Sequence, residues 1–389
     1  MSSYATSITN ASITSAAHTC NLVTTRNNRK VYRVRGGPFE IDDHYSVTTV
    51  VGHGAYGVVC AALDERTGRE VAIKRIGRIF DDLVDGRRIL REITILRLLR
   101  ESKCRNVLQL HRVLRPFEPV DTFRDLYVVT ELLDHDLYSW IRQKRDTSTQ
   151  QIRHVIAQVL RCLADMHAMG IIHRDIKPSN VLLNDSEDVF VCDFGLARAG
   201  MHEFREPTDL TDYVVTRWYR PPELLMMCKY HLPVDVWTAG CVMAEFAMQR
   251  PLFSGRDYIH QLSLLVSTVQ VRSIEFVQES GSAAAGFLSE LVSKSQPLTR
   301  PLTRVLSMLP PDGIDVVEKM LAFDPKERIT AREALRHPFF ASVGGESQAI
   351  YPKPPTENLD MSFDLQCDIS EAQLRRKVWD EIDAHYGES

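Results

Sequence analysis

The sequence lacks the features expected of a membrane protein, a disulfide-stabilised fold or a nucleic-acid-binding protein. None of its apolar runs reaches the roughly 18 residues that a membrane-spanning helix needs. Its eight cysteines include no Cys-x-x-Cys pair and follow no framework spacing, so we expect mostly reduced thiols in a cytoplasmic protein. The net charge of -4 gives no overall attraction to nucleic acid or to an anionic membrane.

Acidic residues are absent from the start of the chain, where the first is Glu40. Residues 1–30 are rich in Ser, Thr and Ala, which favours a disordered extension. The same composition superficially suggests an organelle transit peptide, but a convincing amphipathic arginine face is missing. We expect residues 1–44 to form a disordered N-terminal extension. With 389 residues, 44% of them apolar, the chain is long enough for two modest domains or one large two-lobed one.

The stretch with the most chemical information is His173-Arg174-Asp175-Ile176-Lys177-Pro178-Ser179-Asn180, followed by Asp193-Phe194-Gly195. Apolar residues 181–183 and 189–191 flank a polar turn, which predicts a β-hairpin that returns Asp193 beside Asn180. A carboxylate and an amide oxygen held close together suit Mg²⁺, which prefers oxygen ligands. Asp175 and Lys177 lie two residues apart, which suits a proton acceptor and a cation that stabilises a transferring phosphoryl group.

A glycine-rich segment, Gly52-His53-Gly54-Ala55-Tyr56-Gly57, follows a predicted strand over residues 45–51. Such a segment alone is weak evidence for either fold, because two different folds contain it. A dinucleotide-binding fold requires a helix directly afterwards, whereas residues 58–63 are apolar, partly β-branched and without a helix signal. Two strands joined by a glycine loop instead form a flap whose backbone amides cover nucleotide phosphates. Glycine permits the close approach and the positive φ of such a loop.

Lys74 ends a predicted strand over residues 70–74, and Glu92 lies on a predicted helix over residues 86–100. Glu92 borders the buried stripe of that helix, so it is placed to pair with Lys74. Two plainer readings remain: Lys74 exposed to solvent, and Glu92 paired with a neighbouring surface arginine.

Together these motifs resemble the catalytic core of protein kinases, and Lys177 with the following Pro178-Ser179-Asn180 resembles the Ser/Thr-specific form. Thr211-Asp212-Tyr213, just before Val-x-Thr-Arg-Trp-Tyr-Arg, resembles the dual-phosphorylation lip of mitogen-activated protein kinases. The resemblance implies an α+β, bilobal kinase fold with a small β-rich lobe containing one key helix and a larger, mainly helical lobe. It divides the chain into a kinase domain over 45–340 (N-lobe 45–130, hinge 131–136, C-lobe 137–340, insert about 255–309) and a C-terminal extension over 341–389.

The resemblance also implies the residues of the nucleotide site. ATP would be bound by the glycine loop and its flanks, by the Lys74–Glu92 pair and by residues around the hinge: Val51, Gly52, His53, Gly54, Ala55, Tyr56, Gly57, Val58, Val59, Ala72, Thr130, Glu131, Leu133, Asp136 and Leu182. Backbone groups of Glu131 and Leu133 would bind adenine, Ala72 and Leu182 would sandwich it, and Asp136 would face the ribose. Thr130 would be a small gatekeeper with an open pocket behind the adenine.

In the family's catalytic loop, Asp175 would orient the substrate hydroxyl and accept its proton, and Lys177 would stabilise the transferring phosphoryl group. Thr216 would hydrogen-bond to both. Asn180 and Asp193 would hold Mg²⁺.

Activation would depend on phosphates at Thr211 and Tyr213, which require guanidinium partners. Arg88, Arg91, Arg174 and Arg198 would clamp phospho-Thr211, and Arg217 and Arg220 would receive phospho-Tyr213 and shape a pocket for Pro after the target residue. Phosphorylation of Thr211 would rotate the helix so that Glu92 meets Lys74. The implied partners are an upstream dual-specificity kinase, phosphatases and protein substrates with Ser/Thr-Pro sites, but neither nucleic acid nor membrane. We expect a monomer in the cytoplasm, with the nucleus as a second location.

Supporting features and departures complete the comparison. Asp235 matches the buried acid that braces the catalytic loop, Arg328 should pair with Glu223, and a C-terminal helix from Glu371 to about Asp383 should pack back on the small lobe. Lys353 stands where the family's acidic docking cluster is expected, so docking there is in doubt. Cys192, just before Asp193, could be either a reactive thiol near ATP or a buried inert one.

We expect an active, proline-directed Ser/Thr kinase of the mitogen-activated type. A catalytically dead scaffold is a second hypothesis, but such proteins usually lack one or more of the chemical positions, and this chain fills them all. A cyclin-dependent type is a third, against which the Thr-Asp-Tyr lip and the C-terminal extension argue.

Overall fold

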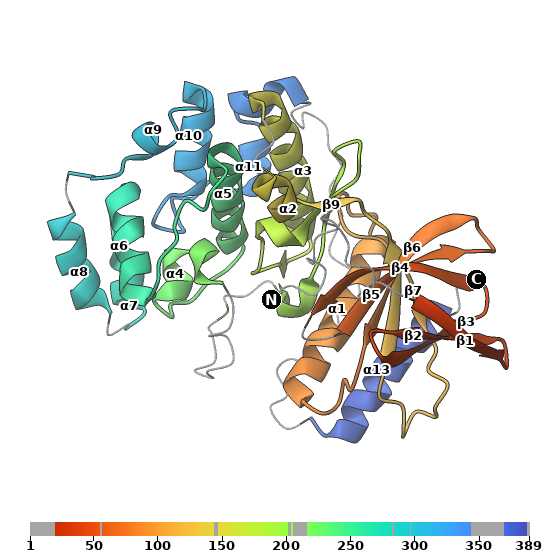
Figure 1. The fold of residues 1–389 in the computed structure, drawn as a ribbon. Helices are drawn as coiled ribbons and strands as arrows, with labels where there is room; N and C mark the ends of the chain where they lie inside the picture. Colours follow the sequence, from red (N-terminus) through yellow and green to blue (C-terminus); the bar gives the residue numbers. More distant parts are fainter. Residues whose placement is uncertain are drawn as a thin grey trace.

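The computed structural model describes residues 20–54, 57–143, 147–200, 204, 216–281, 284–295, 297–343 and 369–386. A β-rich lobe and a larger, mainly helical lobe lie side by side (Figure 1). This two-lobed α+β arrangement confirms the expected fold class. No helix in these ranges is long and apolar enough to cross a membrane.

A five-stranded antiparallel sheet and one helix form the centre of the small lobe. The strand order is β4-β5-β6-β8-β7, with β4 at Tyr45–Gly54, β5 at Gly57–Asp64, β6 at Arg69–Ile76, β7 at Leu110–Leu114 and β8 at Leu126–Glu131. The helix α1 spans Leu83–Glu101, and its N-cap Asp82 accepts a hydrogen bond from the Val84 N–H at 2.7 Å. Apolar residues of α1 such as Ile89 and Ile93 are buried in the same core as Val128 of β8.

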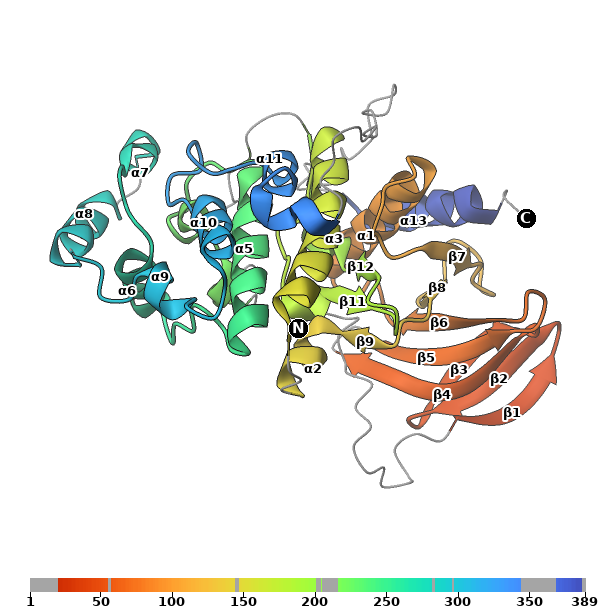
Figure 2. The same ribbon diagram turned by 90° about the horizontal axis from the view of Figure 1, so that it is seen from above.

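A second sheet covers the other face of the five-stranded one. Its three antiparallel strands are β1 at Cys20–Arg26, β2 at Arg29–Val34 and β3 at Gly37–Asp42. Figure 2 shows these strands layered on β4 and β5. Tyr32, Val34, Phe39 and Ile41 are buried against residues of the central sheet such as Ile73.

The expectation that residues 1–44 form a disordered extension is therefore wrong for residues 20–42, while residues 1–19 lie outside the described ranges. The sequence signal that we missed is the alternation of apolar and polar residues, which indicates strands. Tyr32 and Val34 on β2, and Phe39 and Ile41 on β3, are two residues apart and face one side of their sheet, whereas the intervening Arg33 is exposed. The lack of acids before Glu40 described composition but gave no information about the period of the apolar residues.

The large lobe is built around two central helices, α3 at Thr149–Ala168 and α5 at Pro233–Met248. A capping box between Ser148 and Gln151 begins α3. The other helices are α2 at Leu137–Arg142, α4 at Pro222–Leu225, α6 at Tyr258–Thr268, α7 at Glu275–Glu279, α8 at Ala285–Lys294, α9 at Leu302–Val305, α10 at Pro311–Met320 and α11 at Ala331–Leu335. Short strands near the lobe boundary are β9 at His135–Asp136, β10 at Ile171–Ile172, β11 at Val181–Leu183, β12 at Val189–Val191 and β13 at Arg198–Ala199.

The C-terminal helix α13 spans Glu371–Tyr386 and returns to the small lobe, where it lies beside α1 and β7 (Figure 1). Leu374, Val378 and Ile382 of α13 are fully buried. A Cβ on Gly86 of α1 would lie 2.7 Å from the Leu374 side chain, so glycine permits this close packing. Lys353 and its neighbours, on which the docking expectation depends, lie outside the described residues.

Candidate active site

The hairpin that carries the metal-site candidates forms as the polar turn predicted. β11 and β12 pair antiparallel with Val181 opposite Val191. The Cys192 N–H donates to the Asn180 carbonyl at 3.1 Å, which places Asp193 beside Asn180. β11 also pairs with β9, so Leu182 lies opposite Asp136 and the hairpin is joined to the segment that links the lobes.

Asp175, Lys177 and Asn180 form one buried cluster. The Lys177 Nζ donates to Asp175 Oδ2 at 2.5 Å, and the Asn180 Nδ2 donates to the same oxygen at 3.1 Å and to the Asp175 carbonyl at 2.8 Å. Burial raises the pKa of Asp175; the Lys177 charge opposes this shift and the Asp193 charge adds to it. Asp175 is therefore no ordinary solvated loop acid but a poised, oriented carboxylate.

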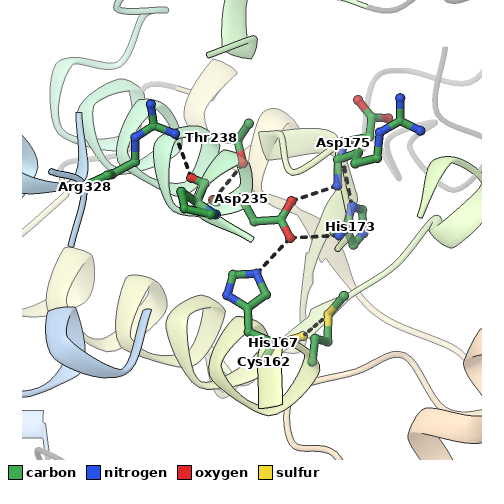
Figure 3. A network of polar contacts seen from close by, with 10 residues as sticks. Cys162, His167, His173, Asp175, Asp235, Thr238 and Arg328 are labelled. Atoms are coloured by element: carbon green, nitrogen blue, oxygen red, sulfur yellow. Dashed lines mark hydrogen bonds and ion pairs between the residues drawn. The ribbon is translucent and has the colours of Figure 1, made fainter. Parts of the chain in front are cut away.

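The backbone of this loop is held from below by Asp235 of α5. The N–H groups of His173 and Arg174 each donate to its carboxylate at 2.8 Å, and the His167 Nε2 lies 3.0 Å from it (Figure 3). Burial alone would raise the pKa of Asp235, but the hydrogen bond from His167, the nearby imidazoles and the His173 N–H lower it overall. Arg174 has a φ of 69°, a conformation rare for a non-glycine residue, and this brace stabilises it. The buried acid thus occupies the bracing position that the resemblance implied.

Lys74 of β6 and Glu92 of α1 form a buried ion pair. The Lys74 Nζ lies 3.2 and 3.3 Å from the two Glu92 carboxylate oxygens, and both side chains are almost fully buried. This geometry excludes both an exposed Lys74 and a surface partner for Glu92. The pair is present in this structure, which therefore holds the α1 orientation that rotation was expected to produce.

The expectation that Asn180 binds a metal is consistent with a buried oxygen of its side chain that has no hydrogen-bond partner among the described residues. Asn180 is fully buried; its amide nitrogen is used by Asp175, and its Oδ1 has no hydrogen-bond partner among the described residues. A buried acceptor of this kind is costly unless a ligand satisfies it. Asp193, held in the left-handed region at φ 68°, lies next to it. Within the described residues no group of three or more His, Cys, Asp or Glu side chains could hold a metal ion. One amide and one carboxylate nevertheless fit Mg²⁺, which keeps waters and takes its other ligands from substrate phosphates.

A cleft between the lobes is lined by apolar side chains from both sides. Its lining comes from β4, β5, β6, β8, β9 and β11, from the residues between β8 and β9, and from the residue Leu108 before β7: Val51, Gly52, Val59, Ala72, Leu108, Thr130, Glu131, Leu132, Leu133, Asp134, His135, Asp136 and Leu182. Most of these residues were expected from the resemblance, but Leu108, Leu132, Asp134 and His135 were not. Leu108 reaches the cleft because its N–H pairs with the Val191 carbonyl at 3.0 Å, a contact between segments distant in the sequence.

The glycine loop closes one end of this cleft as a β-hairpin. His53 pairs with Val58 and Gly54 with Gly57, while Ala55 and Tyr56 lie outside the described residues. Gly57 has a φ of 151°, and a Cβ there would lie 1.7 Å from the Arg75 carbonyl oxygen. Only glycine fits this position, because the neighbouring strand β6 leaves no room for a side chain.

Two acids in the segment 131–136, between the lobes, have defined partners. The Asp136 carboxylate accepts hydrogen bonds from the Ser139 N–H at 2.7 Å and its hydroxyl at 2.8 Å, and so caps α2. The Glu131 carboxylate accepts from the Gln109 N–H at 2.8 Å, and burial raises its pKa to about 7. The Glu131 N–H donates to the Gln109 carbonyl at 3.3 Å, and the Glu131 carbonyl accepts from the Thr130 hydroxyl at 3.2 Å.

The six arginines expected to bind phosphates fall into three sets. Arg91, Arg174 and Arg198 donate to the carbonyl groups of Gly195, Leu196 and Ala197, respectively. Arg217 and Arg220 both contact Tyr258 of α6: the Arg217 guanidinium is 5.6 Å from its ring and the Arg220 Nη1 is 3.1 Å from its hydroxyl. Arg88 forms an ion pair with Asp85 on its own helix at 3.3 Å. Thr211 and Tyr213 lie outside the described residues.

The structure tests the expectations for two further residues, Thr216 and Cys192. Thr216 is exposed, and within the described residues no hydrogen bond joins it to Asp175 or Lys177, so the expected contact is absent. The Asp175 Oδ2 instead accepts from Lys177 and Asn180. Cys192 is fully buried between Leu108 and Leu182, and burial raises the pKa of its thiol well above the usual value. Of its two readings, the structure supports the inert thiol.

Comparison with known proteins agrees with this geometry. Residues 45–340 match the family model described as protein kinase domain. Extracellular signal-regulated kinase 1 of Dictyostelium discoideum is 37% identical over 93% of this chain, which spans 66% of that relative's length. Mitogen-activated protein kinase 6 of Oryza sativa subsp. japonica is 39% identical over 90% of each chain. Mitogen-activated protein kinase 5 of Arabidopsis thaliana is 40% identical over 90% of this chain and 89% of its own.

Proposed function

Since the chain belongs to the mitogen-activated protein kinase family and is a Ser/Thr protein kinase that uses ATP, we propose that it is proline-directed and activated at Thr211 and Tyr213. One observation supports an active enzyme over a scaffold: Lys74 and Glu92 form a buried ion pair, and Asp175, Lys177 and Asn180 form a hydrogen-bonded cluster. Both are arrangements that phosphoryl transfer requires.

We propose the following roles for the catalytic cluster. When bound, Mg·ATP supplies the phosphoryl group and the metal charge that neutralises it. Asp175 orients the substrate hydroxyl and accepts its proton, and Lys177, 2.5 Å from Asp175, stabilises the negative charge that develops on the transferring group. Asn180 Oδ1 and Asp193 would hold the metal, and Glu92 fixes the Lys74 ammonium, which would bind the α- and β-phosphates.

We propose that adenine occupies the apolar cleft, with Ala72 and Leu182 on its two faces. The Glu131 contact would be made by its carbonyl, because its N–H already pairs with Gln109; Leu133 would contribute a second backbone group. Asp136 lines the same cleft, which suits a contact with the ribose. Thr130 is small and buried at the rear of the cleft, as a gatekeeper would be.

The activation proposal depends on the two arginine groups. Arg217 and Arg220 lie around Tyr258, where a phosphate on Tyr213 would gain two cationic partners. Arg91, Arg174 and Arg198 hold the backbone just after Asp193, so a phosphate on Thr211 in contact with them would stabilise that segment and the neighbouring α1. Thr216 then contributes through the position of the lip, not through a hydrogen bond to Asp175.

The wider assignments are also proposals. The kinase domain spans residues 45–340, with its N-lobe at 45–130, hinge at 131–136, C-lobe at 137–340 and insert at about 255–309, and the C-terminal extension spans 341–389. To these we add the sheet over residues 20–42 as part of the small lobe. We propose protein substrates with Ser/Thr-Pro sites, an upstream dual-specificity kinase, opposing phosphatases, and a monomer in the cytoplasm and nucleus.

The test measures phosphate transfer from Mg·ATP to a Ser-Pro peptide and to its Ser-Ala twin, before and after phosphorylation of Thr211 and Tyr213. We expect strong activation and a preference for Ser-Pro. The double variant Thr211→Ala, Tyr213→Phe is the control and should stay at the basal rate. If that variant were fully active, the switch would be rejected; equal rates on both peptides would reject proline direction.

A further inference from the structure

Three arginines line a single cavity on the side of the large lobe far from the small lobe. The lining consists of Arg250, Thr299, Arg300, Arg304 and Val305. Arg250 follows the end of α5, Arg300 precedes α9 and Arg304 lies on α9. The surrounding helices α6, α8 and α9 form the left-hand end of the molecule in Figures 1 and 2, remote from the cleft between the lobes.

The sequence builds this cavity from a short repeat. Residues 297–300 and 301–304 are two consecutive copies of Pro-Leu-Thr-Arg, and the arginines of both copies line the cavity. The second copy forms α9, whose Leu302 is buried. The first copy is held by its backbone, since the Arg300 N–H donates to the Ser267 carbonyl at the end of α6 at 2.9 Å. The Arg300 guanidinium also lies 3.5 Å from the Leu252 carbonyl.

No described residue balances the charge in this cavity. In the part of the chain that the structure describes, no carboxylate lines it, and none of the three guanidinium groups forms an ion pair. Burial and the charge of Arg250 lower the pKa of Arg300, so the arginines repel one another. Elsewhere in the large lobe a buried arginine such as Arg328 has a carboxylate partner. Gathering three like charges without a counter-ion is unfavourable for folding, and an anionic ligand would relieve it.

The lining also restricts the class of anion. Among the described residues that line it, Val305 is the one apolar residue and none is aromatic, so they offer no platform for a nucleobase and no slot for an acyl chain. Guanidinium groups bind phosphate oxygens in bidentate fashion, and the Thr299 hydroxyl is a further donor. Because this enzyme acts on proteins, segments that carry phosphoserine or phosphothreonine are anions that it meets.

We propose that the cavity formed by Arg250, Thr299, Arg300 and Arg304 is a second binding site, separate from the active site, for a phosphate monoester on a protein segment. The phosphate is held by the three guanidinium groups, and the flanking peptide lies across the exposed ends of Arg250 and Arg304. This site would dock partners or substrates that another kinase has already phosphorylated. It depends neither on the specificity for proline nor on the state of the lip.

The test uses the full chain without ATP, so that no turnover occurs. Fluorescence anisotropy measures binding of a labelled peptide that contains one phosphoserine among alanines and glycines, together with its unphosphorylated twin. We expect binding of the phosphopeptide that weakens with salt, competition by inorganic phosphate only at higher concentration, and little binding of the twin.

Single Ala variants locate the site. Arg304 is exposed, so the Arg304→Ala variant should fold normally. Arg304→Ala and Arg250→Ala should each raise the Kd for the phosphopeptide about tenfold or more, because charged hydrogen bonds are lost. Arg304→Lys, which keeps the charge but loses the planar fork, should lie between Arg304→Ala and the unchanged chain. Arg272→Ala is the matched control, because Arg272 is exposed outside the cavity, and it should leave the Kd unchanged. The melting temperature of each variant verifies folding.

Several outcomes would overturn the proposal. Equal binding of both peptides would exclude phosphate recognition, and binding lost in Arg217→Ala, Arg220→Ala but retained in Arg250→Ala, Arg304→Ala would place the phosphopeptide at the lip. If inorganic phosphate bound as tightly as the phosphopeptide, the site would recognise the free ion and no protein segment. Flotation with phosphatidylserine vesicles is the last arm: binding of vesicles that depends on Arg304, without binding of phosphopeptide, would assign the cavity to a membrane surface.

Discussion

Arg328 and Glu223, 105 residues apart, form a buried bidentate ion pair. The two guanidinium nitrogens lie 2.7 and 3.0 Å from the Glu223 oxygens, and the side chains are 0% and 1% exposed. Arg328 also donates to the Pro233 carbonyl at 3.0 Å and lies over the Trp237 ring at 5.1 Å. The pair expected from the sequence is confirmed, and it connects the segment after the lip to the end of the lobe.

Glu223→Gln should destabilise the protein by about 3–5 kcal/mol, because it leaves the Arg328 charge buried without its partner. Urea unfolding measures the change. Glu327→Gln is the control: Glu327 is exposed and 4.0 Å from Arg272, so its loss should change stability by less than about 0.5 kcal/mol. Similar values for both variants would mean that the buried pair contributes nothing beyond a surface pair.

Glu245 of α5 should make stability depend on pH near neutrality. It is 3% exposed, and burial raises its pKa to about 7 despite the hydrogen bond that the Tyr219 hydroxyl donates at 2.8 Å. Because the folded pKa lies above the unfolded value of 4.5, the native state binds more protons between these two values. Stability contributed by the protonated group is present below pH 4.5 and is lost as pH rises toward 7, in total about 3 kcal/mol.

Glu245→Gln removes this titration, so the plot of unfolding free energy against pH should become flatter between pH 4.5 and 7. The exposed Glu279→Gln is the control and should keep the slope of the unchanged chain. If Glu245→Gln retained the slope, the titrating group would lie elsewhere.

Phe39 tests whether the N-terminal sheet is part of the fold. It is 1% exposed on β3 and meets Tyr127 edge to face at 5.2 Å. Phe39→Ala should destabilise the small lobe by about 3–5 kcal/mol through loss of buried area and a cavity. Leu22→Ala on β1, where the side chain is 53% exposed, should have almost no effect. Thermal unfolding compares the two variants. If Phe39→Ala had the melting temperature of the unchanged chain, residues 20–42 would not be part of the folded small lobe.

Much of the site could be predicted because its residues are close in sequence or fixed by local periodicity. The hairpin over residues 181–191 sets the distance between Asn180 and Asp193, and the helical period placed Glu92 at the edge of its buried stripe. These features need only a turn and a repeat to be recognised.

The remainder depends on contacts between distant segments. Leu108 reaches the cleft through its pairing with Val191, and Arg91 meets Gly195 only once α1 has docked. Thr216 was assigned by family position, but its contact depends on the path of the preceding lip, which no local pattern specifies. The N-terminal sheet was missed because its apolar face alternates over only two short strands and gains burial only from the sheet beneath it.

Leu374 should connect the C-terminal helix to nucleotide binding. It is fully buried, and its side chain packs where Gly86 leaves α1 without a Cβ. Leu374→Ala should destabilise by about 2–5 kcal/mol and speed hydrogen exchange in α1, which carries Glu92. The KM for ATP should rise, since Lys74 loses its fixed partner. Arg376→Ala on the exposed face of α13 is the control. If hydrogen exchange in α1 of the Leu374→Ala variant stayed normal, α13 would not stabilise α1.

Asn180 provides the sharpest test of the metal site. Asn180→Asp keeps an oxygen for Mg²⁺ but removes the amide donor to Asp175 and places a second carboxylate 3.1 Å from its Oδ2. Burial and the charge of Asp193 already raise the pKa of Asp175, and a further negative charge raises it more. Because Asp175, as the proposed proton acceptor, must be ionised, the acidic limb of the plot of kcat/KM against pH should shift to higher pH. The Mg²⁺ concentration for half-maximal rate should change little.

Asn180→Ala removes both the donor and the proposed metal ligand, so it should raise the required Mg²⁺ concentration and lower kcat by about 10²-fold. The contrast between the two variants separates metal binding from tuning of Asp175. Asn184→Asp is the control, because it adds the same charge at the turn of the same hairpin, away from Asp175. It should leave the pH profile and the Mg²⁺ dependence unchanged. If Asn180→Asp and Asn184→Asp behaved alike, the amide of Asn180 would have no part in setting the ionisation of Asp175; if Asn180→Ala kept the normal Mg²⁺ dependence, Oδ1 would not be a ligand.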